Sequence, residues 1–432
     1  MITLSRLSIV FVVAAFSPSL SSAQSLSARL TTSLYVLERA DSTDQESTHA
    51  RGYQAFQLSL AKNNISIHTY GQVDGDFNTQ LAGDAKLRMY NLYLEWQNRA
   101  SWGGIRVGRQ PIFAGVAVGT VDGAQVKLRL ARWLRIKGFG GGLLPADQEF
   151  GFIDDVDVNY MVGGQAVILP ASEARVSLSF LNKRQSREGF NTLRADSIGS
   201  VFTQFVNPSD RALQLASIDA SWAIHPKTSL RGRGDYDFYG QRVTRGEVSL
   251  RSDLSPKFAV IGGYTYRFPR LPWNSIFSVF NVEENHEVEA EIYYRHTPSL
   301  RFYGSGAGIF YSDDESYRAT AGAETNFGSV SYVHRGGFAG ALDGINASAY
   351  YPLRRGRVTP MAQLSWASYK PDSDLESRES LFTGIAGVTV RPVKKFTVDG
   401  QVQVLSNRFY SSDLRFLVRL QYWIFEDFGA KR

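Results

Sequence analysis

The feature that most constrains this chain is a two-residue alternation of apolar and polar side chains, which recurs from about residue 26 to residue 424. Near the C-terminus, apolar side chains occupy every second position: Phe416, Val418, Leu420, Tyr422 and Ile424. Successive side chains of a β-strand point to opposite faces, so each such stretch predicts a strand with one apolar and one polar face. A soluble sheet contains a few strands of this kind, whereas a long series separated by turn signals is typical of a transmembrane β-barrel. The pattern therefore predicts an all-β protein that forms a single antiparallel up-and-down barrel.

The alternation divides into 22 expected strands, within a range of 18 to 22. An even number returns the chain to the side of the membrane where it began, as in bacterial single-chain barrels. The expected strands are 26–38, 51–61, 65–75, 87–97, 102–109, 121–131, 134–142, 157–169, 174–184, 211–224, 228–240, 243–253, 257–267, 285–296, 300–311, 315–326, 329–338, 342–352, 357–369, 379–391, 395–407 and 413–424.

The connections between these strands alternate between short and long. The short ones contain Pro, Asn or Gly, which suit tight reversals. The long ones are 39–50, 76–86, 110–120, 143–156, 185–210 and 268–284. Membrane barrels of this type have short periplasmic turns and long extracellular loops, so we expect the long set to lie outside the cell. Two long loops contain apolar clusters, 201–205 and 276–280, which we expect to fold inward or to contact a partner.

The first residues predict a secretory signal peptide. Arg6 supplies a positive charge, residues 7–16 are apolar, and Ser21-Ser22-Ala23 offers a small-residue cleavage site. We therefore expect a signal peptide over 1–23 and the barrel over 24–432. The chain contains no cysteine, which excludes disulfides, c-type haem attachment and a lipoprotein anchor. No later stretch approaches 18 consecutive apolar residues, so we expect no membrane-spanning helix.

The segment 104–130 has a distinctive order of residues. It reads Gly-Ile-Arg-Val-Gly-Arg-Gln-Pro-Ile-Phe from residue 104 and Gly-Thr-Val-Asp-Gly-Ala-Gln-Val-Lys-Leu-Arg-Leu from residue 119. In this it resembles porin-like outer-membrane proteins of Gram-negative bacteria, which often have a Gly-Arg-Gln strand end, an inter-strand segment, and Asp-Gly opening the next strand. The resemblance implies an outer-membrane barrel, without identifying a subfamily. The terminal aromatic usual in the family is displaced here, because seven residues follow Phe425.

Strand phase selects the charged residues that are expected to line the lumen. If Val126, Leu128 and Leu130 face lipid, the residues between them face inward. The expected basic set is Arg106, Lys127, Arg129, Arg135, Lys137, Arg175, Lys183, Arg231 and Arg233, and the expected acidic set is Glu287, Glu289 and Glu291. Fixed cations in a narrow passage raise the local concentration of anions. The acidic strand leaves two alternatives open, an anion-favouring pore or a structural lattice of salt bridges.

Two further residues bracket the segment 110–121. Arg109 and Asp122 are expected either to pair, and so fix how this segment enters the lumen, or to be unrelated, with Asp122-Gly123 serving only as a turn signal.

Catalysis and metal binding find little support in the sequence. The six histidines are scattered and lack metal-ligand spacing. Residues 154–159 collect oxygen ligands but lack the glycine of an EF-hand loop, so we expect a solvated loop and not a Ca²⁺ site. We expect no enzymatic activity, no cofactor, no metal site and no nucleic-acid partner. The isoelectric point near 9.3 and net charge of +6 favour anionic lipopolysaccharide or anionic solutes as partners.

Together these features predict an outer-membrane channel for passive diffusion of small hydrophilic solutes, with a weak preference for anions and with lipid and lipopolysaccharide around it. One alternative is a barrel that sheathes a partner such as an electron-conduit cytochrome, which would have to supply its own haem. Another is a barrel that exports an anionic polymer, and an adhesin or structural barrel is a further class. Whether the chain forms a homo-oligomer or binds a periplasmic partner stays open.

Overall fold

The computed structural model describes residues 25–427, apart from short gaps. The gaps are 42–45, 78–85, 99, 101, 146–147, 149, 152, 154, 187, 196–200, 208–210, 271–282, 339 and 371–376. The expected signal peptide 1–23 and the apolar cluster 276–280 lie outside the described residues.

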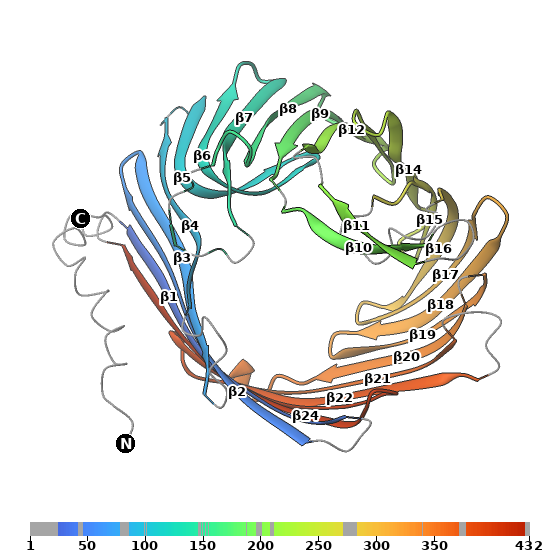
Figure 1. Cartoon of the computed structure of the whole chain (residues 1–432). Coiled ribbons are helices and arrows are strands. Elements are labelled where there is room, and N and C mark those ends of the chain that lie inside the picture. Colours follow the sequence, from blue (N-terminus) through green and yellow to red (C-terminus); the bar gives the residue numbers. More distant parts are fainter. Residues whose placement is uncertain are drawn as a thin grey trace, which may run out of the picture.

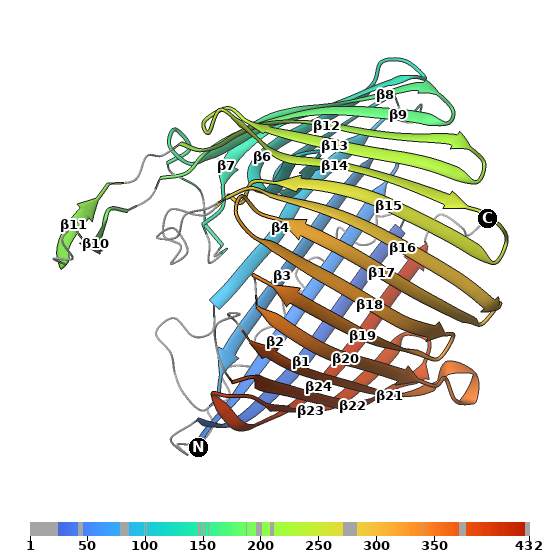
Figure 2. The ribbon, with the colours of Figure 1, turned by 90° about the vertical axis from the view of Figure 1, so that its right-hand side faces the viewer.

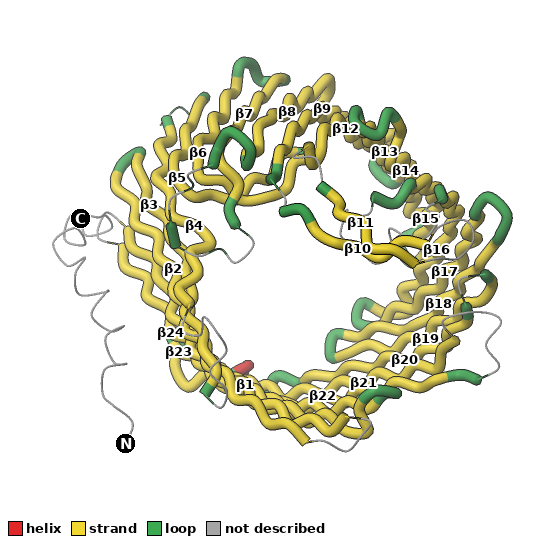
Figure 3. The backbone as a smooth tube through the Cα atoms, viewed as in Figure 1, coloured by secondary structure: helices red, strands yellow, loops and turns green. Residues whose placement is uncertain are grey.

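The chain forms a closed barrel of 22 antiparallel strands (Figures 1 and 3), as the alternation predicts. Each barrel strand pairs with its neighbours along the chain, and β1 closes the ring by pairing with β24. The barrel strands are β1 (Ser25–Asp41), β2 (Glu46–Lys62), β3 (Ile65–Asp76), β4 (Lys86–Gln97), β5 (Gly103–Ala114), β6 (Ala117–Arg129), β7 (Leu134–Leu143), β8 (Tyr160–Ala171), β9 (Ala174–Arg184), β12 (Arg211–His225), β13 (Thr228–Asp237), β14 (Arg242–Asp253), β15 (Phe258–Arg267), β16 (Asn285–Thr297), β17 (Leu300–Phe310), β18 (Glu315–Thr325), β19 (Gly328–Gly337), β20 (Ala341–Tyr350), β21 (Val358–Lys370), β22 (Glu379–Val393), β23 (Phe396–Ser406) and β24 (Tyr410–Asp427).

The outer surface of the barrel is apolar because alternate side chains of each strand point outward. On β24, Phe416, Val418, Leu420 and Tyr422 are all exposed, as their two-residue spacing predicts. A closed ring leaves no strand edge unpaired, so the backbone amides are satisfied even where lipid replaces water. The surface and the ring closure together are the architecture of bacterial outer-membrane barrels.

No helix among the described residues is long and apolar enough to cross a membrane.

The two ends of the barrel differ in their connections. β1 begins and β24 ends at the same end, where Ser25 pairs with Asp427. At this end two residues connect β8 to β9, β12 to β13 and β16 to β17. The long connections 144–159 and 185–210 lie at the other end. The short-turn end is therefore the periplasmic end and the long-loop end is the extracellular end.

One expected loop is absent. The segment 110–120 was predicted as a long connection, but β5 and β6 continue through it and meet at the two-residue turn Gly115-Val116. Asp122 and Gly123 lie within β6, so they do not form a turn either. The strands persist because the inner side of the barrel offers an apolar surface on which this segment is buried. We call residues 110–121 the lumen hairpin.

The loop 185–210 contains a separate two-stranded sheet. Its strands, β10 (Phe190–Ala195) and β11 (Val201–Val206), form a hairpin that extends beyond the extracellular end of the barrel (Figure 2). Phe202 and Phe205 of the expected apolar cluster are exposed there. This hairpin therefore does not pack inside the lumen.

Candidate functional site

Charged side chains line the inner face of the barrel as a consequence of strand phase. Val126 of β6 is exposed on the outer surface, as is Leu130 directly after the strand, so Lys127 and Arg129 lie on the lumen side. The exposed residues of the other strands place the remaining predicted positions inward in the same way: Arg106 of β5, Arg135 and Lys137 of β7, Arg175 and Lys183 of β9, Arg231 and Arg233 of β13, and Glu287, Glu289 and Glu291 of β16.

Five of these cations form one surface, which we call the basic patch: Lys127, Arg129, Arg135, Lys137 and Arg175. Lys127 lies directly opposite Lys137, and Arg129 lies directly opposite Arg135. Together with Arg175 they line a depression of approximately 320 Å³ toward the periplasmic end. Within the described part of the chain, none of the five forms an ion pair. Because no described carboxylate offsets these five like charges, the basic patch is a source of positive potential in the lumen.

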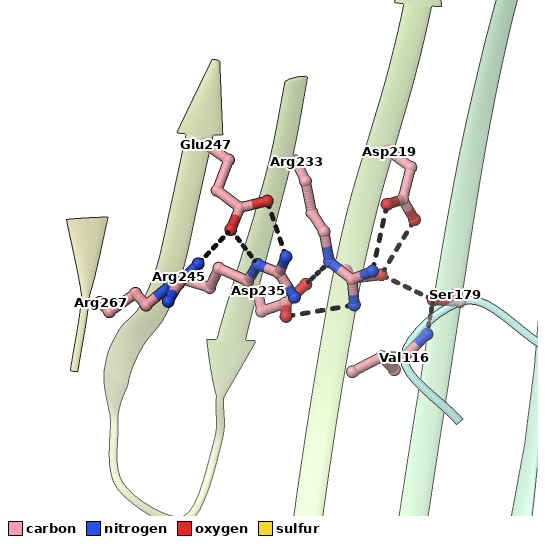
Figure 4. Close-up of polar contacts among 9 residues, drawn as sticks. Val116, Ser179, Asp219, Arg233, Asp235, Arg245, Glu247 and Arg267 are labelled. Atoms are coloured by element: carbon pink, nitrogen blue, oxygen red, sulfur yellow. Dashed lines mark hydrogen bonds and ion pairs between the residues drawn. The ribbon is translucent and has the colours of Figure 1, made fainter. Parts of the chain in front are cut away.

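A different part of the wall is neutralised by ion pairs (Figure 4). The Arg233 guanidinium lies 2.9 Å from Asp235 and 3.5 Å from Asp219. The next two strands contribute Arg245, which lies 2.7 Å from Glu247, and Arg267, which lies 3.5 Å from the same carboxylate. We call these six residues the ion-pair lattice. Arg233, expected to be a free lumen cation, is therefore compensated.

The acidic strand β16 is also largely compensated. Arg318 of β18 lies 2.6 Å from Glu287 and 3.0 Å from Glu289. Glu291 accepts a hydrogen bond of 2.6 Å from the Tyr293 hydroxyl. These carboxylates line one side of a depression of approximately 730 Å³, and Arg175 and Arg231 line the other. The wall thus contains cations without a described ion pair and a lattice of ion pairs, in different places.

The remaining predicted cations have separate settings. Arg106 pairs with Glu95 of β4 at 3.0 Å. Arg231 lies beside Ser221 and Ser249 on the neighbouring strands, and no described carboxylate pairs with it. Lys183 lies near the extracellular end of β9, opposite Met161. Among the predicted cations, those without a described ion pair therefore lie on four strands: Lys127 and Arg129 on β6, Arg135 and Lys137 on β7, Arg175 on β9, and Arg231 on β13.

The lumen hairpin covers part of the inner wall. Figure 1 shows the ends of β5 and β6 crossing the inner side of β7 to β9. Its buried side chains pack against the wall in one apolar cluster: Ile112, Ala114, Ala117 and Val121 from the hairpin, with Phe139, Met161, Leu181 and Leu215 from the wall. Water in the lumen favours the burial of apolar side chains against one another, so this cluster explains why the hairpin docks on the wall.

Polar contacts fix the tip of the hairpin. The Val116 backbone N–H donates to the Ser179 hydroxyl over 2.9 Å, and the Lys137 ammonium donates to the Phe113 carbonyl over 2.7 Å. Gly115 makes the reversal with a φ of 62°, and a Cβ there would lie 2.1 Å from the Ser179 oxygen. Glycine at position 115 therefore allows the tip to approach the wall more closely than any other residue would.

The base of the hairpin is held by Arg109, which is almost fully buried. Its guanidinium pairs with Asp122 at 2.8 Å and also donates to the carbonyls of Met89 and Gly151. Just before it, Gly108 has a φ of 118°, and a Cβ there would lie 2.4 Å from the Leu92 carbonyl oxygen. Arg109 thus links β4, β6 and the connection 144–159 at the point where the hairpin leaves the wall.

The opposite face of the hairpin is open to the lumen. Phe113 and Val118 lie directly opposite one another and are 66% and 67% exposed. The sequence analysis missed this apolar pair because both faces of 110–121 carry apolar residues. The two-residue alternation therefore does not show which side chains of this segment face the lumen. The sequence analysis also missed Arg245, Arg267 and Arg318. Their inward phase could have been read from the alternation of β14, β15 and β18.

The described residues contain no group of three or more His, Asp or Glu side chains placed to hold a metal ion. In the oxygen-rich segment, the Asn159 side-chain amide donates to the Asp155 carboxylate, while Asp154 lies outside the described residues.

No protein-family model and no curated protein matches this sequence. Solved structures of similar shape include the P pilus usher (PapC) translocation pore, at 10% identity and a TM-score of 0.44 over 92% of this chain and 99% of that one. OpdQ of Pseudomonas aeruginosa has 10% identity and a TM-score of 0.43, over 93% of this chain and 99% of that one. A BenF-like porin from Pseudomonas fluorescens Pf-5 has 10% identity and a TM-score of 0.42, over 94% of this chain and all of the other. Similarity at this level identifies no solute.

Proposed function

We propose that this outer-membrane barrel is a channel through which small hydrophilic solutes diffuse passively, with a weak preference for anions. The observation that supports this most strongly is the basic patch, with Lys127 opposite Lys137 and Arg129 opposite Arg135 and no described ion-pair partner for any of them. Mobile anions are the counter-charges available to such a surface in an open lumen.

The preference is expected to be weak because much of the remaining wall is compensated. The ion-pair lattice neutralises charges on β12 to β15, and Arg318 of β18 neutralises Glu287 and Glu289 of β16. Two unit charges 4 Å apart interact by about 1 kcal/mol in bulk water and by several times more beside a protein wall. The basic patch therefore raises the concentration of anions beside it, without excluding cations from the rest of the lumen.

The lumen hairpin supports a channel for small solutes. It occupies space on the inner side of β7 to β9 and presents Phe113 and Val118 to the passage. Its tip donates to Ser179 and accepts from Lys137, so the narrowing lies beside the basic patch. A solute that passes the hairpin on this side must also pass these cations.

A charge reversal tests the proposal. Lys127, Arg129, Arg135 and Lys137 are all replaced by Glu, and the zero-current potential is measured across a planar bilayer in a salt gradient. The wild type should pass chloride more readily than potassium, and the quadruple variant should reverse the sign of the potential. The matched control places Glu at Lys227 and Lys257, which lie in periplasmic turns outside the lumen wall; it should keep the wild-type sign.

Other results would contradict the proposal. A wild type that prefers cations would show that the basic patch does not face the conducting path. Protein that is folded and inserted but does not conduct would favour instead the barrel that sheathes a partner. Preference for anions should also weaken as salt rises, since the screening length shortens from about 10 Å at 0.1 M to about 3 Å at 1 M.

A further inference from the structure

The connection between β20 and β21 differs from the other turns at the periplasmic end. It spans residues 351–357, whereas two residues connect β16 to β17. Leu353 and Val358 bridge across its base, and a short 3₁₀ turn, η4 (Arg354–Gly356), forms its tip. The four residues inside the bridge are Arg354, Arg355, Gly356 and Arg357. Apart from one glycine, the tip of this turn consists of arginine.

The backbone of this tip is in a conformation that arginine disfavours. Arg354 has a φ of 49° and Arg355 a φ of 60°, and Gly356 follows with a φ of 81°. Side chains with a Cβ rarely occupy this left-handed region, where Gly or Asn is the usual residue. Strain of this kind concentrates at functional sites, where a particular side chain is needed. The turn would form more easily without these two side chains, which suggests that the side chains themselves are used.

A fourth arginine joins the group from the neighbouring strand. Arg391 of β22 donates its backbone N–H to the Arg357 carbonyl over 2.7 Å. The four arginines surround a depression of approximately 510 Å³, together with Val358, Val390 and Pro392. We call Arg354, Arg355, Arg357 and Arg391 the arginine rim.

The arginine rim lacks a counter-charge. In the part of the chain that the structure describes, none of its four guanidinium groups forms an ion pair. The adjacent Lys395, by contrast, lies 3.1 Å from Glu426. Four cations around one depression repel one another unless an anion lies among them.

The alternation of side chains along β21 and β22 indicates on which face of the barrel Arg357 and Arg391 lie. Leu364 of β21 and Val388 of β22 are exposed on the outer surface, and Val358 and Val390 share their phase. Arg357 and Arg391, each one residue out of phase with these, lie on the lumen side. The rim therefore lies at the periplasmic mouth of the barrel, where Arg357 and Arg391 continue the lumen side of β21 and β22.

We propose that the arginine rim binds a small oxyanion of the phosphate class that carries two or more negative charges. A guanidinium presents a planar fork of N–H donors that matches two oxygens of such a group, and several forks can engage one multiply charged anion. A monovalent halide offers neither the fork geometry nor enough charge to offset four cations. Binding at this mouth does not require that the barrel conduct, so the proposal stands or falls separately from the channel function.

Binding of inorganic pyrophosphate to the detergent-purified protein, measured by calorimetry in the absence of lipid, tests this proposal. The double variant Arg354→Gly, Arg355→Gly removes two of the forks and also relieves the backbone, since glycine adopts a positive φ readily. Its affinity for pyrophosphate should fall by at least about tenfold, because charge-assisted hydrogen bonds are lost. Its thermal stability should equal or exceed that of the wild type, which separates lost binding from lost folding.

The control variant Lys227→Gln, Lys257→Gln removes two cations from other periplasmic turns and should bind pyrophosphate like the wild type. The proposal is overturned if the wild type does not bind pyrophosphate, or if the double glycine variant binds it unchanged. It is also overturned if the control loses as much affinity, since general positive charge would then explain the binding.

Discussion

Replacing Ile112 with Ala should release the lumen hairpin from the wall while the barrel stays closed. Ile112 is 0% exposed and packs in a cluster with Met161, Leu181 and Leu215, which are at most 2% exposed. Truncating a buried isoleucine to alanine costs about 2–5 kcal/mol. The hydrogen bonds from Val116 to Ser179 and from Lys137 to Phe113 contribute only about 1 kcal/mol each to docking of the tip. They therefore do not compensate for the apolar contacts that the truncation of Ile112 removes. None of the contacts that close the ring between β1 and β24 is involved.

Hydrogen exchange at the Val116 backbone N–H reports the docking directly, because this group donates to Ser179 only when the tip lies on the wall. A loss of 2 kcal/mol or more lowers its protection by at least about thirtyfold. The same variant should show a noisier single-channel current, since the released tip moves within the lumen. The matched control is Val118→Ala, which truncates a residue of the same hairpin that is 67% exposed; its protection should stay near that of the wild type. Equal protection of Val116 in all three proteins would refute the account of how the hairpin is held.

Two further predictions concern the closed ring and the compensated wall. Because a closed barrel has no free strand edge, unheated and boiled samples should migrate differently on a denaturing gel; identical mobility of folded protein would argue against ring closure. Arg318→Gln leaves Glu287 and Glu289 without their cation, so the zero-current potential should shift toward cation preference. Lys395→Gln breaks the ion pair with Glu426 at the periplasmic end, outside the lumen wall, and should leave the potential unchanged; an equal shift in both variants would exclude a local effect of the two glutamates.

The strand number and the inward phase could be predicted from the sequence because both depend on a period of two. Val126 of β6 and Leu130 directly after it fix the phase of this strand on their own, and this phase decides the side on which Lys127 and Arg129 lie. Turn residues such as the Pro226-Lys227 pair mark where each strand ends. These are local properties, so errors in one strand do not propagate to the others.

The contacts between strands could not be predicted in the same way. Arg318 neutralises Glu287 although 31 residues separate them, and this depends on the register of three strands. The lumen hairpin was misread as a loop because Ile112 and Phe113 are both apolar, so no polar face marks 110–121 as a strand. The left-handed backbone of Arg355 could not be anticipated, since Gly and Asn are the residues that signal it.

The most direct test of the account is whether Lys127 faces an aqueous, conducting lumen while Leu128, its neighbour, faces lipid. The chain contains no cysteine, so Lys127→Cys and Leu128→Cys each introduce a single thiol. A water-soluble, negatively charged methanethiosulfonate is added during single-channel recording. The account predicts a stepwise change in conductance and a loss of anion preference for Lys127→Cys, and no response for Leu128→Cys. A response of Leu128→Cys alone would show that the phase assigned to β6 is wrong by one residue, so that Leu128 and not Lys127 faces the lumen. If neither variant responds, there is no aqueous passage beside the basic patch, which contradicts the account.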